Sequence, residues 1–201
     1  MTNVFRLVVL ISGNGSNLQA LLDACASGEL PASVATVVSN KADAYGLVRA
    51  KRAGVEAIHF PKFENESRQE YDTRLAAYVS AYLPDYVILA GWMRIFSSAF
   101  LDHFPNRIIN LHPALPGMFP GTHAIERAYD AYQRGEINHT GVMVHLVPDE
   151  GVDNGPVLCQ QEVYFQPKES LEQFEARVHD IEHHLLVNTL KHLLEETERS
   201  T

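Results

Sequence analysis

The sequence predicts a single α/β domain in which helices cover both faces of a mostly parallel β-sheet. Three observations support this fold class. Apolar, β-branched runs alternate along the chain with segments of helical periodicity. The 201 residues fit one compact domain, and 46% of them are apolar, which is enough for a substantial core. No repeat, low-complexity segment or linker divides the chain, so we expect one domain over residues 1–201.

The individual elements follow from local patterns. A strand is expected at 4–12, followed by a helix from Asn17 to Ser27 that carries leucines on one face and ends at Gly28. The helix that opens at Ser67 has Glu70 at the capping-box spacing. Further strands are expected at 34–40, 56–60, 85–91, 107–113, 140–147 and 155–165, and helices at 44–54, 67–84, 97–105, 122–136 and 170–197, the last being one long terminal helix. This order predicts a three-layer, Rossmann-like arrangement, in which ligands bind beyond the carboxyl ends of the strands.

Composition excludes several classes of protein. The 16 basic and 25 acidic residues give a formal charge of −9, which argues against a nucleic-acid partner. Cys25 and Cys159 lie far apart, so we expect neither a disulfide framework nor a cysteine-based zinc site, and a reducing compartment fits best. The apolar run near the amino terminus is too short to span a membrane and lacks a signal-peptide layout. We therefore expect a cytoplasmic protein without membrane attachment, as a monomer or homodimer.

A glycine-rich turn, "SGNGSNLQ" at residues 12–19, joins the first strand to the first helix. Such a turn presents free N–H groups and the positive end of the helix dipole, which suits a phosphate. No lysine follows as in a P-loop, and Leu18 occupies the third glycine position of a dinucleotide fingerprint. A monophosphate is therefore favoured over a nucleotide cofactor. A tight turn with Ser16 or Asn17 as helix N-cap explains the pattern equally well.

A second turn, "IINLHPALPGMFPG" at residues 108–121, ends a buried strand in a loop rich in proline and glycine. Asn110 and His112 are two apart, so in an extended chain both side chains lie on one face. An amide and an imidazole together suit acyl transfer, where donors stabilise an oxyanion. With no GxSxG motif and no nearby cysteine, the attacking group would belong to the substrate.

A possible partner for His112 is the polar turn "VPDEGVDNGPV", which carries Asp149, Glu150 and Asp153. A carboxylate beside His112 would orient the ring and raise its pKa. Taken singly, a histidine bonded to the backbone and a turn-forming aspartate are the stronger interpretations. The functional interpretation is favoured by the expectation that His112 and Asp153 lie at the same end of adjacent strands.

A third motif, "HDIEH", places His179 and His183 four residues apart on the terminal helix. The pattern matches inverted zinc proteases, but it is short and lacks a third ligand. We therefore expect no metal.

Taken together, these motifs resemble the phosphoribosylglycinamide formyltransferases, folate-dependent enzymes of purine synthesis. The similarity spans nearly the whole chain and includes "VVLISGNGSNLQALLDAC", "YVILAGWMRIFS", "RIINLHPALPG", "VHLVPDEGVDNGPVLCQ" and "ARVHDIEH". It implies transfer of a formyl group from 10-formyltetrahydrofolate, a cosubstrate, to the amine of 5-phosphoribosylglycinamide. It also implies a ribonucleotide half at about 1–100 and a catalytic, folate-binding half at about 101–201.

The resemblance assigns roles to individual residues. The catalytic residues would be Asn110, His112 and Asp153. The ribonucleotide would be bound by Gly15, Ser16, Asn17, His179 and Glu182. Folate would be bound by Arg68, Met93, Arg94, Ile95, Phe96, Asn110, Asp149, Glu150, Gly151, Val152 and Asp153.

The sequence departs from the family at the catalytic loop. Ala114, Leu115, Pro116 and Gly117 stand where members usually read Ser-Leu-Leu-Pro. The segments "HAIERAYDAYQRG" and "DEGVD" look longer than in many bacterial members. Two other functions stay open: a formyltetrahydrofolate hydrolase or a transferase acting on another amine, and a non-catalytic phosphate-binding module.

Overall fold

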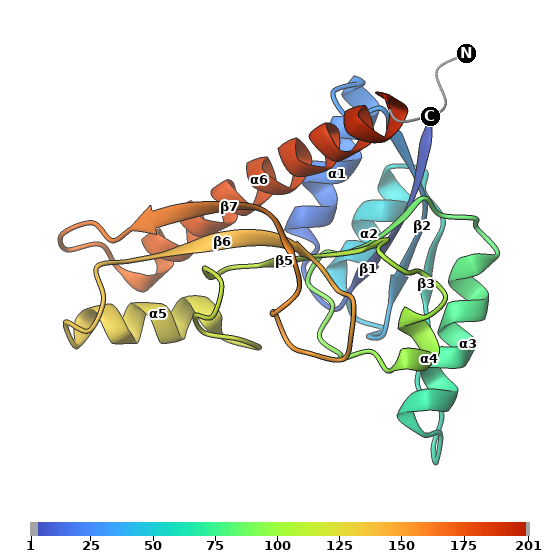
Figure 1. The fold of residues 1–201 in the computed structure, drawn as a ribbon, viewed down its shortest axis with the longest axis horizontal. Helices are drawn as coiled ribbons and strands as arrows, with labels where there is room; N and C mark the ends of the chain where they lie inside the picture. Colours follow the sequence, from blue (N-terminus) through green and yellow to red (C-terminus); the bar gives the residue numbers. More distant parts are fainter. Residues whose placement is uncertain (1–3, 200–201) are drawn as a thin grey trace.

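The structure is a computed structural model that describes residues 4–199. Its seven-stranded sheet has the order β3-β2-β1-β4-β5-β6-β7, with helices packed on both faces (Figure 1). The strands are β1 (Phe5–Ile11), β2 (Ala32–Ser39), β3 (Ala57–His59), β4 (Tyr86–Leu89), β5 (Ile108–His112), β6 (His139–Leu146) and β7 (Val157–Tyr164). The helices are α1 (Ser16–Ser27), α2 (Tyr45–Arg52), α3 (Arg68–Ser80), α4 (Ser98–Leu101), α5 (Ala124–Gln133) and α6 (Leu171–Arg199). Every predicted element is present, and the predicted fold class is confirmed.

Strand β1, in the interior of the sheet, separates two hydrophobic cores. Because side chains alternate along a strand, Leu7 and Val9 enter one core, while Val8 and Leu10 enter the other. The first core is shared with α1, α2, α5 and α6, and the second with α3 and α4. All four of these β1 side chains are fully buried, which explains the continuous apolar run of this strand.

The sheet is parallel from β3 to β5 and antiparallel from β5 to β7. The chain leaves β1 on one side toward β2 and returns on the other side as β4, so the direction of winding switches between β1 and β4. In an open α/β sheet this is where ligands bind, beyond the carboxyl ends of the strands.

The helix ends follow local sequence signals. Ser67 accepts a hydrogen bond from the Glu70 N–H and the Glu70 carboxylate accepts one from the Ser67 N–H, which is the predicted capping box. Gly28, at φ 79°, ends α1 in the left-handed conformation as predicted.

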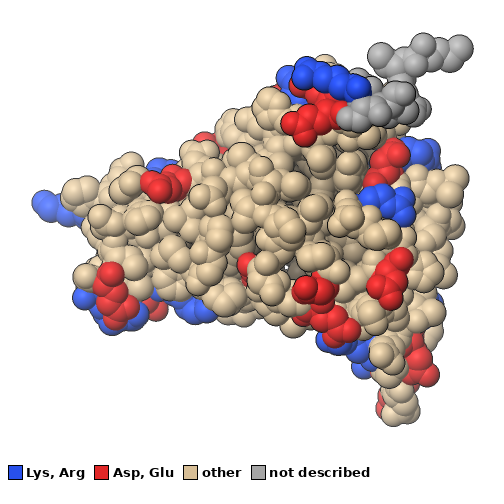
Figure 2. All heavy atoms as spheres, in the orientation of Figure 1, with Lys and Arg blue, Asp and Glu red and all other residues tan. Residues whose placement is uncertain are grey.

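Charged side chains of both signs are scattered over the face shown in Figure 2, among larger areas of other residues. Over the described part of the chain, no helix is long and apolar enough to cross a membrane.

Candidate active site

Loops from the carboxyl ends of β1 and β4 meet at the switch in winding direction. The Ser12 N–H donates to the Gly91 carbonyl at 3.0 Å, and the Ser12 hydroxyl donates to Asn40 at 2.6 Å. The same hydroxyl accepts a hydrogen bond from the Met93 N–H at 2.8 Å. Because Leu89 of β4 is paired with Asn110 of β5, the glycine turn, the 93–96 segment and Asn110 lie along one edge of the sheet.

The glycine turn leaves the amino terminus of α1 open. Its N-cap is Gly15, at φ 75°, and no side chain caps the helix. The first turn also contains no acidic residue. The expectation of Ser16 or Asn17 as N-cap is therefore wrong, because the left-handed conformation at this position favours glycine. An uncapped helix start with free N–H groups can bind an anion.

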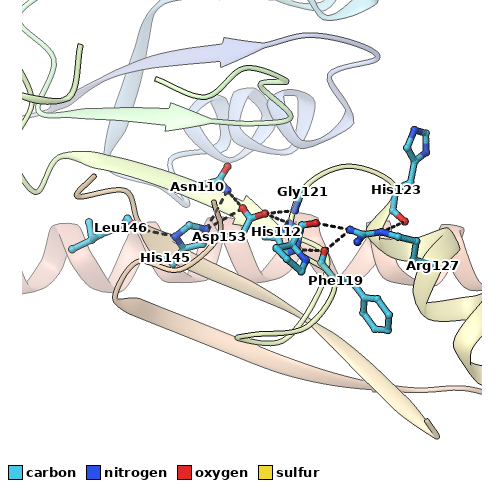
Figure 3. A network of polar contacts seen from close by, with 10 residues as sticks. Asn110, His112, Phe119, Gly121, His123, Arg127, His145, Leu146 and Asp153 are labelled. Carbon is cyan, nitrogen blue, oxygen red and sulfur yellow. Dashed lines mark hydrogen bonds and ion pairs between the residues drawn. The ribbon is translucent and has the colours of Figure 1, made fainter. Parts of the chain in front are cut away.

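Asn110, His112 and Asp153 form one cluster of polar contacts (Figure 3). The Asn110 amide donates to Asp153 Oδ1 at 3.0 Å, and His112 Nδ1 lies 3.3 Å from Asp153 Oδ2. The side chains of His112 and Asp153 are only 5% and 10% exposed. The sequence spacing of Asn110 and His112 thus directs both side chains to the same carboxylate.

Burial and charge act in opposite directions on this cluster. Burial lowers the pKa of His112 below its usual value, although Asp153 and the Phe119 carbonyl favour the charged ring. As expected, Asp153 acts to raise the pKa of His112, but the loss of water on burial outweighs this attraction, so the net shift is downward. For Asp153, burial opposes ionisation, yet His145, the Gly121 N–H and His112 hold its pKa below the usual value.

The turn that carries Asp153 reaches the cluster from an unexpected direction. Strand β6 runs antiparallel to β5, so its last residue, Leu146, pairs with Ile109 near the amino end of β5. The sequence suggested that Asp153 follows a strand that ends beside His112, and this expectation is wrong. Residues 147–156 instead fold back along β5, with Asp153 itself at φ 51°.

The proline-rich loop covers the cluster through its backbone. The Phe119 carbonyl accepts hydrogen bonds from His112 Nε2 at 3.1 Å and from Arg127 at 2.7 Å, and the Gly121 N–H donates to Asp153 Oδ2 at 2.7 Å. Arg127, from α5, also donates to the Pro120 carbonyl at 2.7 Å. Phe119 itself has φ 45°, a left-handed conformation that costs free energy in a non-glycine residue.

Sequence reasoning missed Arg127 and His145. His145 Nδ1 donates to the Leu146 carbonyl at 2.8 Å, and His145 Nε2 lies 3.1 Å from the Asn110 amide nitrogen and 3.6 Å from Asp153 Oδ1. The Asn110 amide nitrogen thus contacts both His145 and Asp153. The position of His145 on a strand next to β5 was the available signal, whereas nothing in the sequence marked Arg127.

The residues assigned to folate surround the same edge of the sheet. Arg68 forms an ion pair with Glu150, whose other oxygen accepts from the Ser98 N–H at 3.1 Å. Three apolar side chains of this group are exposed: Met93 (59%), Ile95 (48%) and Val152 (40%). Two others point elsewhere, since Phe96 is buried between Trp92 and Phe100, and Arg94 lies over the Tyr71 ring. Asp149 accepts from the Gly151 N–H.

On α6, His179 Nδ1 lies 2.5 Å from the Glu182 carboxylate. Glu182 is buried, and its hydrogen bond raises the pKa of His179 above the usual value. Within residues 4–199, no hydrogen bond or ion pair joins this pair to the glycine turn or to Asp153. In the same range, no group of three or more His, Cys, Asp or Glu side chains is arranged to hold a metal ion.

Comparison with known proteins places these features in a family. Residues 5–190 match the formyl transferase family. The chain is 44% identical to the phosphoribosylglycinamide formyltransferase of Dictyostelium discoideum, covering 93% of this chain and 97% of that protein, and 44% identical to that of Escherichia coli, covering 89% and 82%. The crystal structure of glycinamide ribonucleotide transformylase 1 from Symbiobacterium toebii superimposes with a TM-score of 0.90 at 41% identity, over 98% of this chain and 90% of that one. The chain belongs to the formyl transferase family.

Proposed function

We propose that the chain is a phosphoribosylglycinamide formyltransferase, which transfers the formyl group of 10-formyltetrahydrofolate to the amine of the glycinamide ribonucleotide. The observation that carries the proposal is the Asn110–His112–Asp153 cluster, whose carboxylate contacts both other side chains. It lies on the same edge of the sheet as an uncapped helix start suited to a phosphate. Relatives that carry this name align with nearly the whole chain.

The ribonucleotide phosphate would bind to the N–H groups of Gly15, Ser16 and Asn17 at the start of α1. His179 and Glu182 would bind the ribose side of the same substrate. The buried Glu182 carboxylate keeps a proton on His179 favoured, so the pair presents an N–H donor from a fixed rotamer. Residues of about 1–100 would then form the ribonucleotide half, and residues of about 101–201 the catalytic and folate-binding half. Helix α6 of the second half would add His179 and Glu182 to the ribonucleotide site.

The folate would lie against the exposed apolar side chains Met93, Ile95 and Val152. The Arg68–Glu150 ion pair is half exposed beside them, so Arg68 would be available to a folate carboxylate. Arg94, Phe96, Asp149 and Gly151 would shape this pocket through the backbone, because their side chains are engaged elsewhere or, for glycine, absent. Asn110 and Asp153 would face the formyl group.

Attack by the substrate amine on the formyl carbon forms a C–N bond and moves an electron pair onto the formyl oxygen. The attacking nitrogen must then lose a proton, and Asp153 can accept it, because its pKa is held low and the carboxylate is ionised at neutral pH. It accepts the proton from the attacking nitrogen and delivers it to the folate nitrogen as the original C–N bond breaks. No net proton is taken up, and no metal is used.

The hydrogen bonds of the cluster couple this proton transfer to stabilisation of the oxyanion. While Asp153 is ionised, it holds one N–H of Asn110. Protonation of the carboxylate weakens it as an acceptor, so that N–H becomes available when the oxyanion carries most charge. His112 is oriented by oxygen atoms at both ring nitrogens. Burial lowers the pKa of His112, and the negative charge of the oxyanion would act in the opposite direction by favouring the protonated ring.

Product accounting tests the proposal. The purified protein is supplied with both substrates and then with each one alone, and tetrahydrofolate, formylated ribonucleotide and formate are measured. Equal amounts of tetrahydrofolate and formylated product, with neither formed when the ribonucleotide is omitted, support the proposal. Formate without the ribonucleotide indicates a hydrolase, and folate binding without either product indicates another acceptor amine or a binding module.

A further inference from the structure

Arg49, on α2, is hydrogen-bonded to the glycine turn that precedes α1. Its Nε donates to the Asn14 carbonyl at 2.9 Å, and one Nη donates to the Asn14 side-chain oxygen at 2.9 Å. The other Nη donates to Gln19 on α1 at 3.3 Å. One guanidinium therefore fixes both atoms by which Asn14 can accept a hydrogen bond, and joins the turn to the helix it opens.

The same helix is packed against the turn without free space. The Gly46 N–H of α2 donates to the Gly13 carbonyl at 3.1 Å. A Cβ atom added to Gly15 would lie 2.7 Å from Gly46 Cα, and one added to Gly46 would lie 2.3 Å from the side chain of Ile11. The start of α2 and the turn thus form one unit, so the position of Arg49 relative to the turn is set by the backbone.

Within residues 4–199, the positive charge of Arg49 has no carboxylate partner. Its hydrogen-bond acceptors are all neutral, and it forms no ion pair within residues 4–199. Its guanidinium lies 4.9 Å from the centre of the Tyr45 ring, which holds it in place without neutralising it. This charge lies directly behind N–H groups that no side chain caps, so both favour an anion at the turn.

We propose that Arg49 is a positioning residue for phosphate recognition: it fixes Asn14, and through it the N–H groups of Gly15 to Asn17, and adds positive charge behind them. This inference rests on the proposed binding of a phosphate at the turn. Arg49 does not itself contact the phosphate, and its effect is confined to the ribonucleotide because Asn110, His112 and Asp153 lie on other elements.

Arg52 provides a matched control on the same helix. It also lies over the Tyr45 ring, at 5.8 Å, and donates to the Tyr45 hydroxyl at 3.0 Å. It is exposed and has no hydrogen bond to the turn. Replacing Arg52 therefore removes an equal charge and a similar aromatic contact, but leaves the hydrogen bonds to Asn14 intact.

The test compares Arg49→Met, Arg49→Lys and Arg52→Met in steady-state formyl transfer, with each substrate varied in turn. Removal of charged hydrogen-bond donors predicts a KM for the ribonucleotide at least about tenfold higher in Arg49→Met, with kcat and the KM for folate within about twofold of wild type. Arg49→Lys keeps the charge without the planar guanidinium, so its KM for the ribonucleotide should lie between those of wild type and Arg49→Met. Arg52→Met should resemble wild type.

The inference is overturned if Arg49→Met and Arg52→Met have equal KM for the ribonucleotide, or if Arg49→Met raises both KM values alike, as general loss of structure would. Calorimetric titration with inorganic phosphate separates this inference from the proposed function. Phosphate binding that is weaker in Arg49→Met but not in Arg52→Met supports the role of Arg49 even if the wild type transfers no formyl group. Unchanged phosphate binding in an active enzyme rejects the role of Arg49 and leaves the proposed function standing.

Discussion

Replacement of Asp153 by Asn keeps the shape of the side chain but removes its charge and one acceptor oxygen. In the structure Asp153 Oδ2 accepts the Gly121 N–H at 2.7 Å, and Oδ1 accepts the Asn110 amide at 3.0 Å. An asparagine has one oxygen, so its NH₂ group must face one of these two donors. In a side chain only 10% exposed, one unsatisfied donor costs about 1–3 kcal/mol.

The effect on catalysis should exceed the effect on stability. Loss of the group that carries the proton from amine to folate removes a general acid–base contribution of about 100- to 10,000-fold. We expect kcat of Asp153→Asn to fall by that factor, and urea denaturation to show a free energy of unfolding lower by about 1–3 kcal/mol. Both substrates should still bind.

The assay is steady-state formation of tetrahydrofolate at saturating ribonucleotide, with equilibrium binding of each substrate as the control. Retention of kcat within about tenfold of wild type would refute the role of Asp153 in proton transfer, because general acid–base catalysis contributes more than that. A large loss of kcat accompanied by loss of folate binding would instead identify Asp153 as a binding residue.

Three further predictions follow from single contacts. Ser67→Ala removes the capping box and should lower the free energy of unfolding in urea by about 1 kcal/mol; no change would mean that the cap adds nothing to α3. Arg127→Met releases the carbonyl of Phe119 that also orients His112, so kcat should fall by about ten- to a hundredfold with an unchanged circular dichroism spectrum, and unaltered turnover would contradict this. The free energy of unfolding, measured as a function of pH for wild type, His112→Gln and His179→Gln, should distinguish the two histidines. The pKa of His112 is lowered, so its contribution to stability is present above about pH 6.5 and is lost as pH falls through its folded pKa. The pKa of His179 is raised, so its contribution is present below about pH 6.5 and is lost as pH rises through its folded pKa. Stability differences from wild type that change with pH in the same direction for both variants would be inconsistent with these shifts.

The fold was predictable because its local signals agree with one another. Alternating side chains of β1 enter two cores, which produces a continuous apolar run, and Gly28 and the Ser67 capping box end and begin helices where the sequence indicated. The antiparallel direction of β6 was not predictable from its apolar pattern. That direction depends on the path of the chain between β5 and β6, which no local periodicity reports.

The site was predictable where one element determines the geometry. Asn110 and His112 share a carboxylate because they are two apart on one strand. The role of Arg127 depends on the distance between α5 and the loop, a tertiary relation without a sequence signal. The low pKa of His112 likewise depends on how deeply the ring is buried, and the sequence showed only that a carboxylate could be near.

The most direct test of the account is a single-turnover experiment with a labelled formyl group on the folate, comparing wild type with His112→Ala. The wild type should move the label to the ribonucleotide amine within one turnover, with no label released as formate. His112→Ala should bind both substrates and fold normally while transferring the label at least about a hundredfold more slowly, since it lacks the ring whose protonated form would stabilise the oxyanion. Transfer at the wild-type rate in this variant would contradict the claim that the Asn110–His112–Asp153 cluster performs the chemistry.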